Sequence, residues 1–215
     1  MKDIAIYGAG GFGREIAYLL EQINKVQPQY NLIGYYDDGV DPNTAVGELR
    51  VLGNISDLNA IDYQLCVVVA IGAPAIKKKV IEQINNPNLS FPNLFHPSVS
   101  WQLDTVKFGK GNIICAGNLL TVDIEIGDFV ILNLSCTVGH DTVIKDYSSF
   151  MPSVNISGEV LIEEAVYVGT GAKIINQLTI GQNTIVGAGA VVSKDLPANC
   201  TAIGIPAKPF RYHNE

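Results

Sequence analysis

The sequence predicts a Rossmann-like α/β domain followed by a parallel β-helix. Three observations lead to this prediction. Every sixth residue from Phe108 to Val192 is a large aliphatic residue or phenylalanine. The residue four places after each of these is small in most of the later repeats, and glycine follows directly six times. Upstream of the repeats, a short apolar strand leads into a glycine-rich turn and a stretch with helical spacing of apolar residues.

A fixed short period is typical of a solenoid, in which each unit stacks on the next to share one core. A helix repeats about every 3.6 residues and a strand every second residue, so neither sustains a period of six. A prism does, if each flat face is a short strand and each edge is a turn. We expect the glycines that follow the repeat residues to serve turns with unusual backbone angles. The repeat residues are Phe108, Ile114, Leu120, Ile126, Leu132, Val138, Ile144, Phe150, Ile156, Ile162, Val168, Ile174, Ile180, Val186 and Val192.

The first half of the chain follows a different pattern. Residues 4–7 form an apolar strand, residues 8–13 read G-A-G-G-F-G, and residues 14–22 begin a predicted helix. A strand, a G-x-G-x-x-G turn and a helix in this order are typical of a turn that holds a pyrophosphate at a helix N-terminus. The rival interpretation is a tight turn kept only for packing of the helix on the sheet.

Two further predicted strands end in residues that suit a nucleotide. The strand over 32–36 ends in Asp37 and Asp38, where an acid can accept a ribose hydroxyl. The strand over 65–71 ends in Gly72 and leads into a helix over 75–84. Strands with such ends predict a small doubly wound sheet that binds its ligand at their carboxyl ends.

Three lysines, Lys77, Lys78 and Lys79, lie on this last helix. We interpret them as a solvated face, with Lys77 close enough to the helix start to reach a phosphate. Residues 85–100, rich in Asn and Pro, predict a connection between domains, with a final strand possible near 91–95.

Composition narrows the class of protein. The chain has 215 residues, 16% of them charged, and a net charge of −7, which argues against a nucleic-acid surface. No apolar run has the length that a bilayer requires. The four cysteines show no C-x-x-C spacing and predict packing thiols in a reducing compartment, so we expect a cytoplasmic protein. They are Cys66, Cys115, Cys136 and Cys200.

Of the three histidines, only one has the setting of a functional residue. His96 precedes a proline in the connection and His213 lies close to the C-terminus, so we expect neither to take part in chemistry. His140 lies inside the repeats, is followed at once by Asp141, and has small and polar neighbours in the sequence at Asn133, Ser135, Thr137 and Gly139. Those neighbours suit a site better than a core.

With these motifs in view, the chain resembles a known family. The G-x-G-x-x-G domain is joined to hexapeptide repeats, with N-x-S-C-x-x-x-H-[DE] at 133–141 and G-x-P-A-K at 204–208. This combination resembles the hexapeptide-repeat acyltransferases of the sialic-acid O-acetyltransferase type and the nucleotide-amino-sugar N-acetyltransferases of bacterial glycan synthesis. The resemblance implies a left-handed β-helix, a homotrimer, and acetyl-CoA in the groove between neighbouring β-helices. It also implies that residues 1–95 hold the sugar nucleotide and that residues 96–215 hold acetyl-CoA.

The resemblance further implies roles for individual residues. His140 is the general base and Asp141 is the partner that makes it a better base. The acceptor is held by Gly10, Gly11, Phe12, Asp37, Asp38, Gly72, Lys77 and Asn133. Positions that contact acetyl-CoA, largely through backbone, are Gly158, Thr170 and Ala188, and Ser149 stands where some relatives carry a second histidine that touches acetyl-CoA.

The chemistry fits a chain with few ionisable candidates. A thioester is already activated, so transfer to an amine or hydroxyl needs alignment, one base and donors for the developing oxyanion. A histidine titrates close to neutral pH and can accept the proton. We expect direct transfer in a ternary complex, without a metal and without a nucleophilic Ser or Cys.

Four alternatives stay open at this point. Sialic acid or a related sugar could be O-acetylated with the same base, and the sequence names neither the sugar nor the nucleotide. An NAD-dependent dehydrogenase would explain the glycines but not the β-helix. A zinc enzyme of the γ-carbonic anhydrase type needs three histidines in the repeats, where only His140 lies. The last alternative is a nucleotide-binding scaffold without catalysis.

Overall fold

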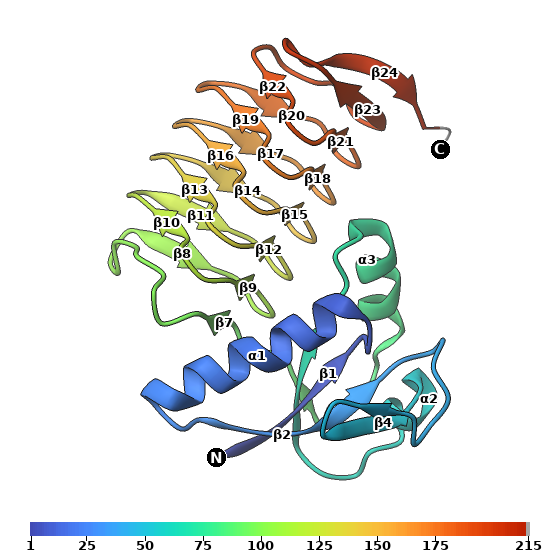
Figure 1. The fold of residues 1–215 in the computed structure, drawn as a ribbon. Coiled ribbons are helices and arrows are strands. Elements are labelled where there is room, and N and C mark those ends of the chain that lie inside the picture. Colours follow the sequence, from blue (N-terminus) through green and yellow to red (C-terminus); the bar gives the residue numbers. More distant parts are fainter. Residues whose placement is uncertain (214–215) are drawn as a thin grey trace. The chain divides into compact units, whose positions relative to one another are not determined.

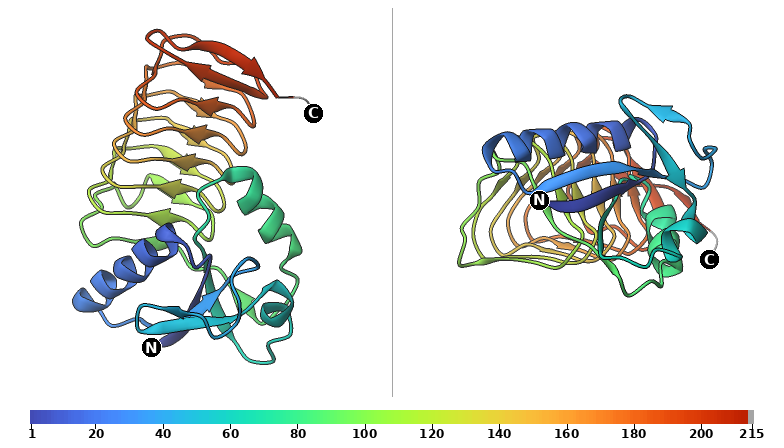
Figure 2. Two further views of the ribbon diagram at one scale, coloured as in Figure 1. Left: turned by 45° about the vertical axis from the view of Figure 1, so that its right-hand side comes forward. Right: turned by 90° about the horizontal axis from the view of Figure 1, so that it is seen from below.

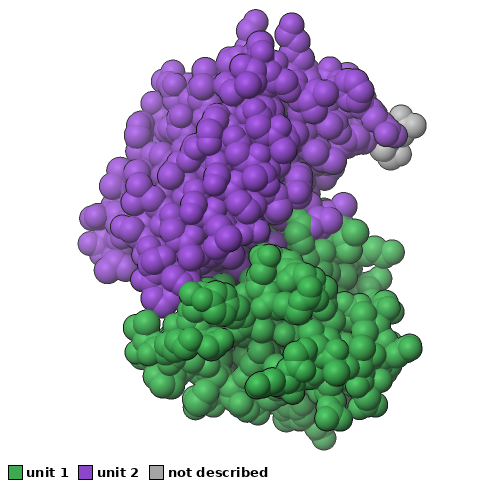
Figure 3. All heavy atoms as spheres, in the orientation of Figure 1, with its two compact units in different colours: residues 1–72, 76–93 green, residues 73–75, 94–215 purple. Residues whose placement is uncertain are grey.

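The structure is a computed structural model that describes residues 1–213 and divides the chain into two compact units (Figure 3). Unit 1 consists of residues 1–72 and 76–93, and unit 2 consists of residues 73–75 and 94–215. Unit 1 contains three helices and one mixed sheet, and unit 2 is a stack of β-helical coils (Figure 1).

The sheet of unit 1 has six strands in the order β3-β4-β2-β1-β5-β6. All neighbouring pairs are parallel except β3 and β4, which are antiparallel. The strands are β1 (Lys2–Tyr7), β2 (Tyr30–Tyr36), β3 (Ala45–Val46), β4 (Leu49–Gly53), β5 (Leu65–Val69) and β6 (Leu89–Ser90), and the helices are α1 (Gly11–Val26), α2 (Ile55–Asn59) and α3 (Pro74–Gln83).

The chain reverses its direction of travel across the sheet at β1, with β2 paired on one side of it and β5 on the other. In open α/β sheets a ligand binds at such a point, outside the carboxyl ends of the strands. Helix α1 buries the apolar side chains that the spacing predicted, while the interiors of β1 and β5 are fully apolar and buried, as parallel strands covered on both faces are. The α1 residues that are buried are Gly13, Ile16, Leu19, Leu20 and Ile23.

Unit 2 confirms the parallel β-helix. Its strands form three sheets, and most strands pair in parallel with the strand 18 residues further along, so three hexads make one coil (Figures 1 and 2). The first sheet contains β10 (Leu119–Leu120), β13 (Thr137–Val138), β16 (Asn155–Ile156), β19 (Lys173–Ile174) and β22 (Val191–Val192). The second contains β8 (Val106–Phe108), β11 (Ile124–Ile126), β14 (Val143–Ile144), β17 (Leu161–Ile162) and β20 (Thr179–Ile180).

The third sheet extends to both ends of the unit. It contains β7 (Leu94–Phe95), β9 (Ile113–Ile114), β12 (Ile131–Leu132), β15 (Ser149–Phe150), β18 (Tyr167–Val168), β21 (Ile185–Val186), β23 (Cys200–Ile203) and β24 (Lys208–Tyr212). Strand β7 pairs with β9, so the segment expected to be a plain connection already forms the start of the β-helix. Strand β24 returns antiparallel to β23.

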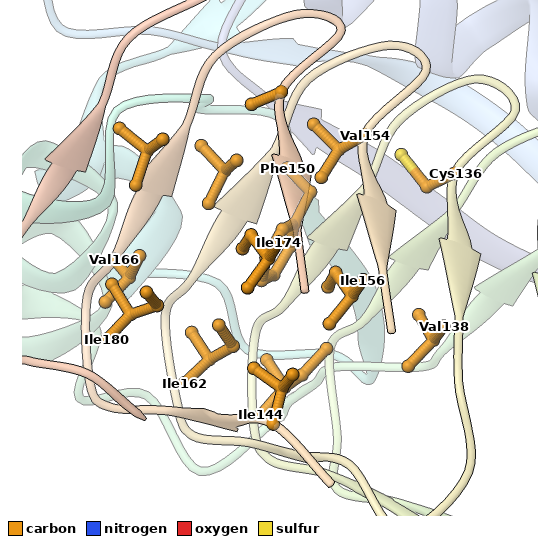
Figure 4. Packing of buried hydrophobic residues seen from close by; sticks show 14 of the residues in the cluster. Cys136, Val138, Ile144, Phe150, Val154, Ile156, Ile162, Val166, Ile174 and Ile180 are labelled. Atoms are coloured by element: carbon orange, nitrogen blue, oxygen red, sulfur yellow. The ribbon is translucent and has the colours of Figure 1, made fainter. Parts of the chain in front are cut away.

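The core of unit 2 is made by two columns of side chains. The repeat residues from Ile114 to Val192 are 0–3% exposed, and the small residues four places after them are buried beside them (Figure 4). Each coil therefore has a large side chain on each face and a small one near each corner. Stacking identical positions removes almost all of this apolar surface from water, which is the main stabilising contribution in a solenoid.

The glycines that follow the repeat residues have a different role from the one expected. None of them has a positive φ; the left-handed residue at each corner stands two places later, as at Asp141 (φ 56) and Gly189 (φ 67). A Cβ on Gly139 would lie 2.5 Å from the backbone N of Gly158 in the next coil. Glycine is needed after the repeat residue because adjacent coils approach closely there, so the prediction of unusual backbone angles at these positions was wrong.

This distinction can be tested on stability. We expect Gly181→Ala to lower the free energy of unfolding by about 1–3 kcal/mol, because its Cβ would meet the backbone N of Ala198 in the next coil. Gly189→Asn should cost less, because nothing lies within 4 Å of a Cβ there and asparagine tolerates left-handed backbone. Urea unfolding of both variants measures the difference, and equal losses would contradict the assignment.

Candidate active site

The carboxyl ends of β1, β2 and β5 bring most of the predicted acceptor-binding residues to one edge of the unit 1 sheet. Gly10 and Gly11 follow β1, Asp37 and Asp38 follow β2, and Gly72 follows β5. The turns are tied together by backbone hydrogen bonds, such as Gly8 N–H to Tyr36 O at 2.8 Å. Phe12, half-buried, completes the first turn of α1.

The glycines of the turn divide into two kinds. Gly8 has φ 111 and a Cβ on it would lie 2.9 Å from Ala70 O, while a Cβ on Gly13 would collide with the carbonyl oxygen of Gly8. These two glycines are required by the fold itself. No atom lies within 4 Å of a Cβ on Gly10, and only the end of the Arg14 side chain comes near one on Gly11. The fold leaves Gly10 and Gly11 open, which fits residues kept small for a ligand.

The start of α1 is suited to an anion. Its N-cap residue, Gly10, provides no side-chain cap, and its first turn contains no acidic residue. The first N–H groups of a helix lack partners within the helix and carry partial positive charge, so they bind phosphate oxygens readily. The geometry at this end of the sheet is that of a phosphate site.

The two acids after β2 have different partners. The Asp37 carboxylate accepts Ala9 N–H through Oδ2 and Gly39 N–H through Oδ1, each at 2.8 Å. Asp38 is exposed and accepts Ile55 N–H through Oδ1 at 2.9 Å. Sequence reasoning treated the pair alike and missed Tyr7, whose buried hydroxyl faces Asp38 without a hydrogen-bond partner among residues 1–213. Burial and then the Asp38 carboxylate raise the pKa of Tyr7.

The lysines of α3 do not form one solvated face. Lys77 is 1% exposed, and burial lowers the pKa of its ammonium well below the usual value. Lys78 is half-buried and Lys79 is exposed. The expectation of a solvated face was wrong for Lys77, because apolar residues with helical spacing place it on the inner side of the helix, as they do Val80.

In unit 2, His140 stands at the corner that follows β13. Its Nδ1 lies 2.7 Å from Asp141 Oδ2, and the two side chains are 56% and 57% exposed. With an ionised carboxylate at this distance, Nδ1 carries the ring proton and Nε2 keeps a lone pair. Within residues 1–213, Nε2 has no hydrogen-bond partner, so an accessible base remains for a ligand.

The backbone fixes this pair in place. Asp141 adopts the left-handed conformation that its corner requires, which aspartate tolerates better than most residues. Its N–H donates to Val122 O in the coil before, and His140 O accepts Glu159 N–H at 2.7 Å from the coil after. The imidazole therefore projects from a rigid scaffold rather than from a mobile loop.

Gly158 lies directly against the His140 ring. A Cβ on Gly158 would be 2.5 Å from both Cε1 and Nε2 of that ring. Gly158 is 18 residues after His140, one full coil, so the repeat length alone could have placed the two together. The corners that follow β10, β13, β16, β19 and β22 form one edge of the prism, which we call the His140 edge.

Thr170 and Ala188 are exposed on a different edge. They follow β18 and β21, at the corners that lead from the third sheet into the first, and we call this the Thr170 edge. Asn133 lies on the Thr170 edge too, 7% exposed, with its Oδ1 accepting Leu134 N–H. Within one chain the structure thus brings Gly158 to His140, but not Asn133, Thr170 or Ala188.

Ser149 and the other histidines have structural settings. Ser149 is fully buried on β15, so its position gives no support to a contact with the thioester. His96 Nδ1 lies 2.8 Å from Ser98 Oγ and accepts Ser98 N–H at the first corner of unit 2, and burial lowers the pKa of His96. His213 Nε2 lies 2.8 Å from Thr201 Oγ1.

Two classes of function gain nothing from the described residues. Among residues 1–213, no group of three or more His, Cys, Asp or Glu side chains could hold a metal ion. Over the same residues, no helix has both the length and the apolar character needed to cross a bilayer. All four cysteines are buried free thiols.

Comparison with known proteins agrees with this geometry. Residues 3–84 match the PglD N-terminal domain family. The chain is 33% identical over 217 residues to GDP-perosamine N-acetyltransferase of Escherichia coli O157:H7, covering 98% of this chain and 97% of the relative. A histidine-to-asparagine mutant of perosamine N-acetyltransferase from Caulobacter crescentus, solved with CoA and GDP-perosamine, superimposes with a TM-score of 0.88 at 30% identity, covering 98% of each chain.

A second solved structure covers the same extent. The acetyltransferase domain of PglB from Neisseria gonorrhoeae FA1090, in complex with acetyl coenzyme A, has a TM-score of 0.88 at 30% identity, with 97% of this chain and 99% of that chain covered. Both units and the His140 corner lie within the matched length. The chain belongs to the family of hexapeptide-repeat nucleotide-amino-sugar N-acetyltransferases.

Proposed function

We propose that this protein transfers the acetyl group of acetyl-CoA to the amino group of a nucleotide-linked 4-amino-4,6-dideoxyhexose in bacterial surface glycan synthesis. The observation that carries the proposal is the His140–Asp141 pair, which leaves Nε2 accessible on an exposed edge. The phosphate turn of unit 1 supplies a place for the nucleotide part of the acceptor. Both features belong to one chain that matches GDP-perosamine N-acetyltransferase over 98% of its length.

The proposed reaction needs no covalent enzyme intermediate. The amine nitrogen attacks the thioester carbonyl while His140 Nε2 takes its proton, and the tetrahedral intermediate then expels the CoA sulfur, which receives that proton. Asp141 holds the imidazole in the tautomer that accepts a proton at Nε2 and favours the imidazolium that forms.

The developing oxyanion needs a donor close to the base. Gly158 borders the ring, and within residues 1–213 its N–H donates no hydrogen bond. A free backbone N–H beside the base can stabilise the negative charge of the intermediate without reorganising during the reaction. We assign Gly158 to this role, and Thr170 and Ala188 to the wall along which acetyl-CoA lies.

Acetyl-CoA and sugar nucleotides are made in the cytoplasm, and the proposal therefore places the enzyme there. Acetyl-CoA consumption should be assayed against UDP-, dTDP- and GDP-linked 4-amino sugars, with sialic acid as the rival acceptor. We expect turnover with one nucleotide-linked amino sugar and release of a free thiol in equal amount. Turnover with sialic acid alone would favour O-acetylation, and turnover with none of these acceptors would contradict the proposal.

We further propose that three copies form the working enzyme. His140 and Gly158 lie on one edge of the prism, and Thr170 and Ala188 lie on another, so copies packed side by side can bring the two edges together around one acetyl-CoA. A single side chain more than half exposed cannot by itself keep water from a thioester. Three-fold packing gives three equivalent sites.

Mixed trimers test this arrangement. Subunits carrying His140→Ala and subunits carrying Thr170→Trp should each be nearly inactive alone. After random mixing, about a quarter of the interfaces should combine an intact His140 with an intact Thr170, restoring about a quarter of wild-type activity. Light scattering should give about three times the chain mass of 23.1 kDa. A fully active monomer, or no recovery on mixing, would overturn the shared site.

A further inference from the structure

The two neighbouring acids at the carboxyl end of β2 do not have the same freedom to bind a ligand. Both oxygens of Asp37 already accept backbone N–H groups, one from Ala9 and one from Gly39. The Asp37 N–H itself donates to Gly53 O at 3.0 Å. Asp37 is therefore built into the backbone on three sides and ties the turn after β1 to the turn after β2.

The Ala9 contact is the significant one for binding. Ala9 is 7% exposed and stands directly before Gly10, the N-cap residue of α1. Its N–H points to a carboxylate within the protein and is not available to a phosphate. By fixing Ala9, Asp37 fixes the direction in which Gly10, Gly11 and the first N–H groups of α1 face.

Asp38 has the opposite character. It is exposed, and only its Oδ1 is engaged, by the N–H of Ile55 at the start of α2. Its Oδ2 has no hydrogen-bond partner in the part of the chain that is described, while the unpartnered Tyr7 hydroxyl lies close to this carboxylate. An ionised carboxylate accepts hydrogen bonds only, so the groups it can recognise are donors such as a ribose hydroxyl or a base N–H.

We propose that Asp37 is a positioning residue that holds the phosphate turn in its binding shape, and that Asp38 alone of the two contacts the nucleoside of the acceptor. This inference rests on the proposed function, in which unit 1 holds a nucleotide. Asp37 then acts on the diphosphate through the backbone, and Asp38 acts directly on the sugar or base. The two roles predict different losses when the ligand is shortened.

The experiment compares two probes, GDP and inorganic pyrophosphate, as inhibitors competing with the nucleotide sugar, with UDP run in parallel. Asp37→Ala should weaken GDP and pyrophosphate by the same factor, about tenfold, because both depend on the turn. Asp38→Ala should weaken GDP by a similar factor and leave pyrophosphate unchanged. The Michaelis constant for acetyl-CoA should stay at the wild-type value in both variants, and Asp37→Asn, which keeps one acceptor oxygen, should recover part of the loss.

A second measurement does not depend on any ligand. Amide hydrogen exchange at residues 9–13 should become at least tenfold faster in Asp37→Ala and stay unchanged in Asp38→Ala. A loss confined to GDP in Asp37→Ala, with unchanged exchange, would overturn the inference and make Asp37 a nucleoside contact. If wild-type protein bound neither GDP, UDP nor pyrophosphate, the proposed function of unit 1 would fail, while the exchange result would still decide whether Asp37 shapes the turn.

Discussion

His140→Ala is expected to lower kcat by about 10²- to 10⁴-fold, the usual range for loss of a general base. The imidazole stands at an exposed corner where no other described residue is hydrogen-bonded to Nε2, so no neighbouring group can take over the proton. Michaelis constants for both substrates should change little, because the ring contributes one small contact to either. Steady-state kinetics with acetyl-CoA and the preferred amino sugar measure both effects.

Controls separate chemistry from folding. His96→Ala removes a histidine that caps a turn and should leave kcat close to wild type, although it costs stability. Asp141→Asn keeps an acceptor oxygen for Nδ1–H but loses the negative charge, so its loss in kcat should be smaller than that of His140→Ala. A His140→Ala enzyme that kept more than a tenth of wild-type kcat would remove His140 from the role of base.

Gly11→Val is expected to raise the Michaelis constant for the nucleotide sugar by about 10- to 100-fold. A branched side chain at the start of α1 would keep phosphate oxygens from the backbone N–H groups, and hydrogen bonds to charged groups contribute about 1.5–3 kcal/mol each. The constant for acetyl-CoA should stay close to wild type, since the acetyl-CoA site is assigned to unit 2. Initial rates with each substrate varied in turn distinguish the two constants.

The glycines of the same turn provide the control for Gly11→Val. A Cβ on Gly11 meets only the flexible end of Arg14, so the variant should unfold at nearly the wild-type temperature. Gly13→Ala should instead lower the unfolding temperature, because its Cβ would collide with the Gly8 carbonyl. If Gly11→Val weakened acetyl-CoA and spared the acceptor, the proposed division of roles between the units would be wrong.

Local patterns predicted the fold well because each of its elements is periodic. In unit 2 the aliphatic column repeats every six residues, and a one-residue slip would turn every large side chain out of the core, so the pattern fixes the register. In unit 1 the strand, glycine turn and helix follow one another within the first 26 residues, and the helix buries the side chains its spacing selects. Boundaries differed by only a few residues, as at β2, which begins at Tyr30 rather than residue 32.

The candidate site was only partly predictable. His140 and Asp141 are adjacent in the chain, so their pairing required no knowledge of the fold, and Gly158 follows from the 18-residue coil. The burial of Lys77 and Ser149 did not follow, because a single side chain on a short helix or strand carries no period that reveals which way it faces. The different partners of Asp37 and Asp38 depend on where the turns at residues 9, 39 and 55 come together.

The sequence by itself determined the two architectures, the coil length and the histidine–aspartate pair, because these depend on spacing along the chain. Only the tertiary structure decided why glycine follows the repeat residues, since that depends on the approach of backbone from the next coil. It also decided that Gly8 and Gly13 serve packing while Gly10 and Gly11 stay open, and that one acid of the pair is occupied by backbone N–H groups. Such distinctions arise from contacts between residues distant in sequence, and no local pattern records them.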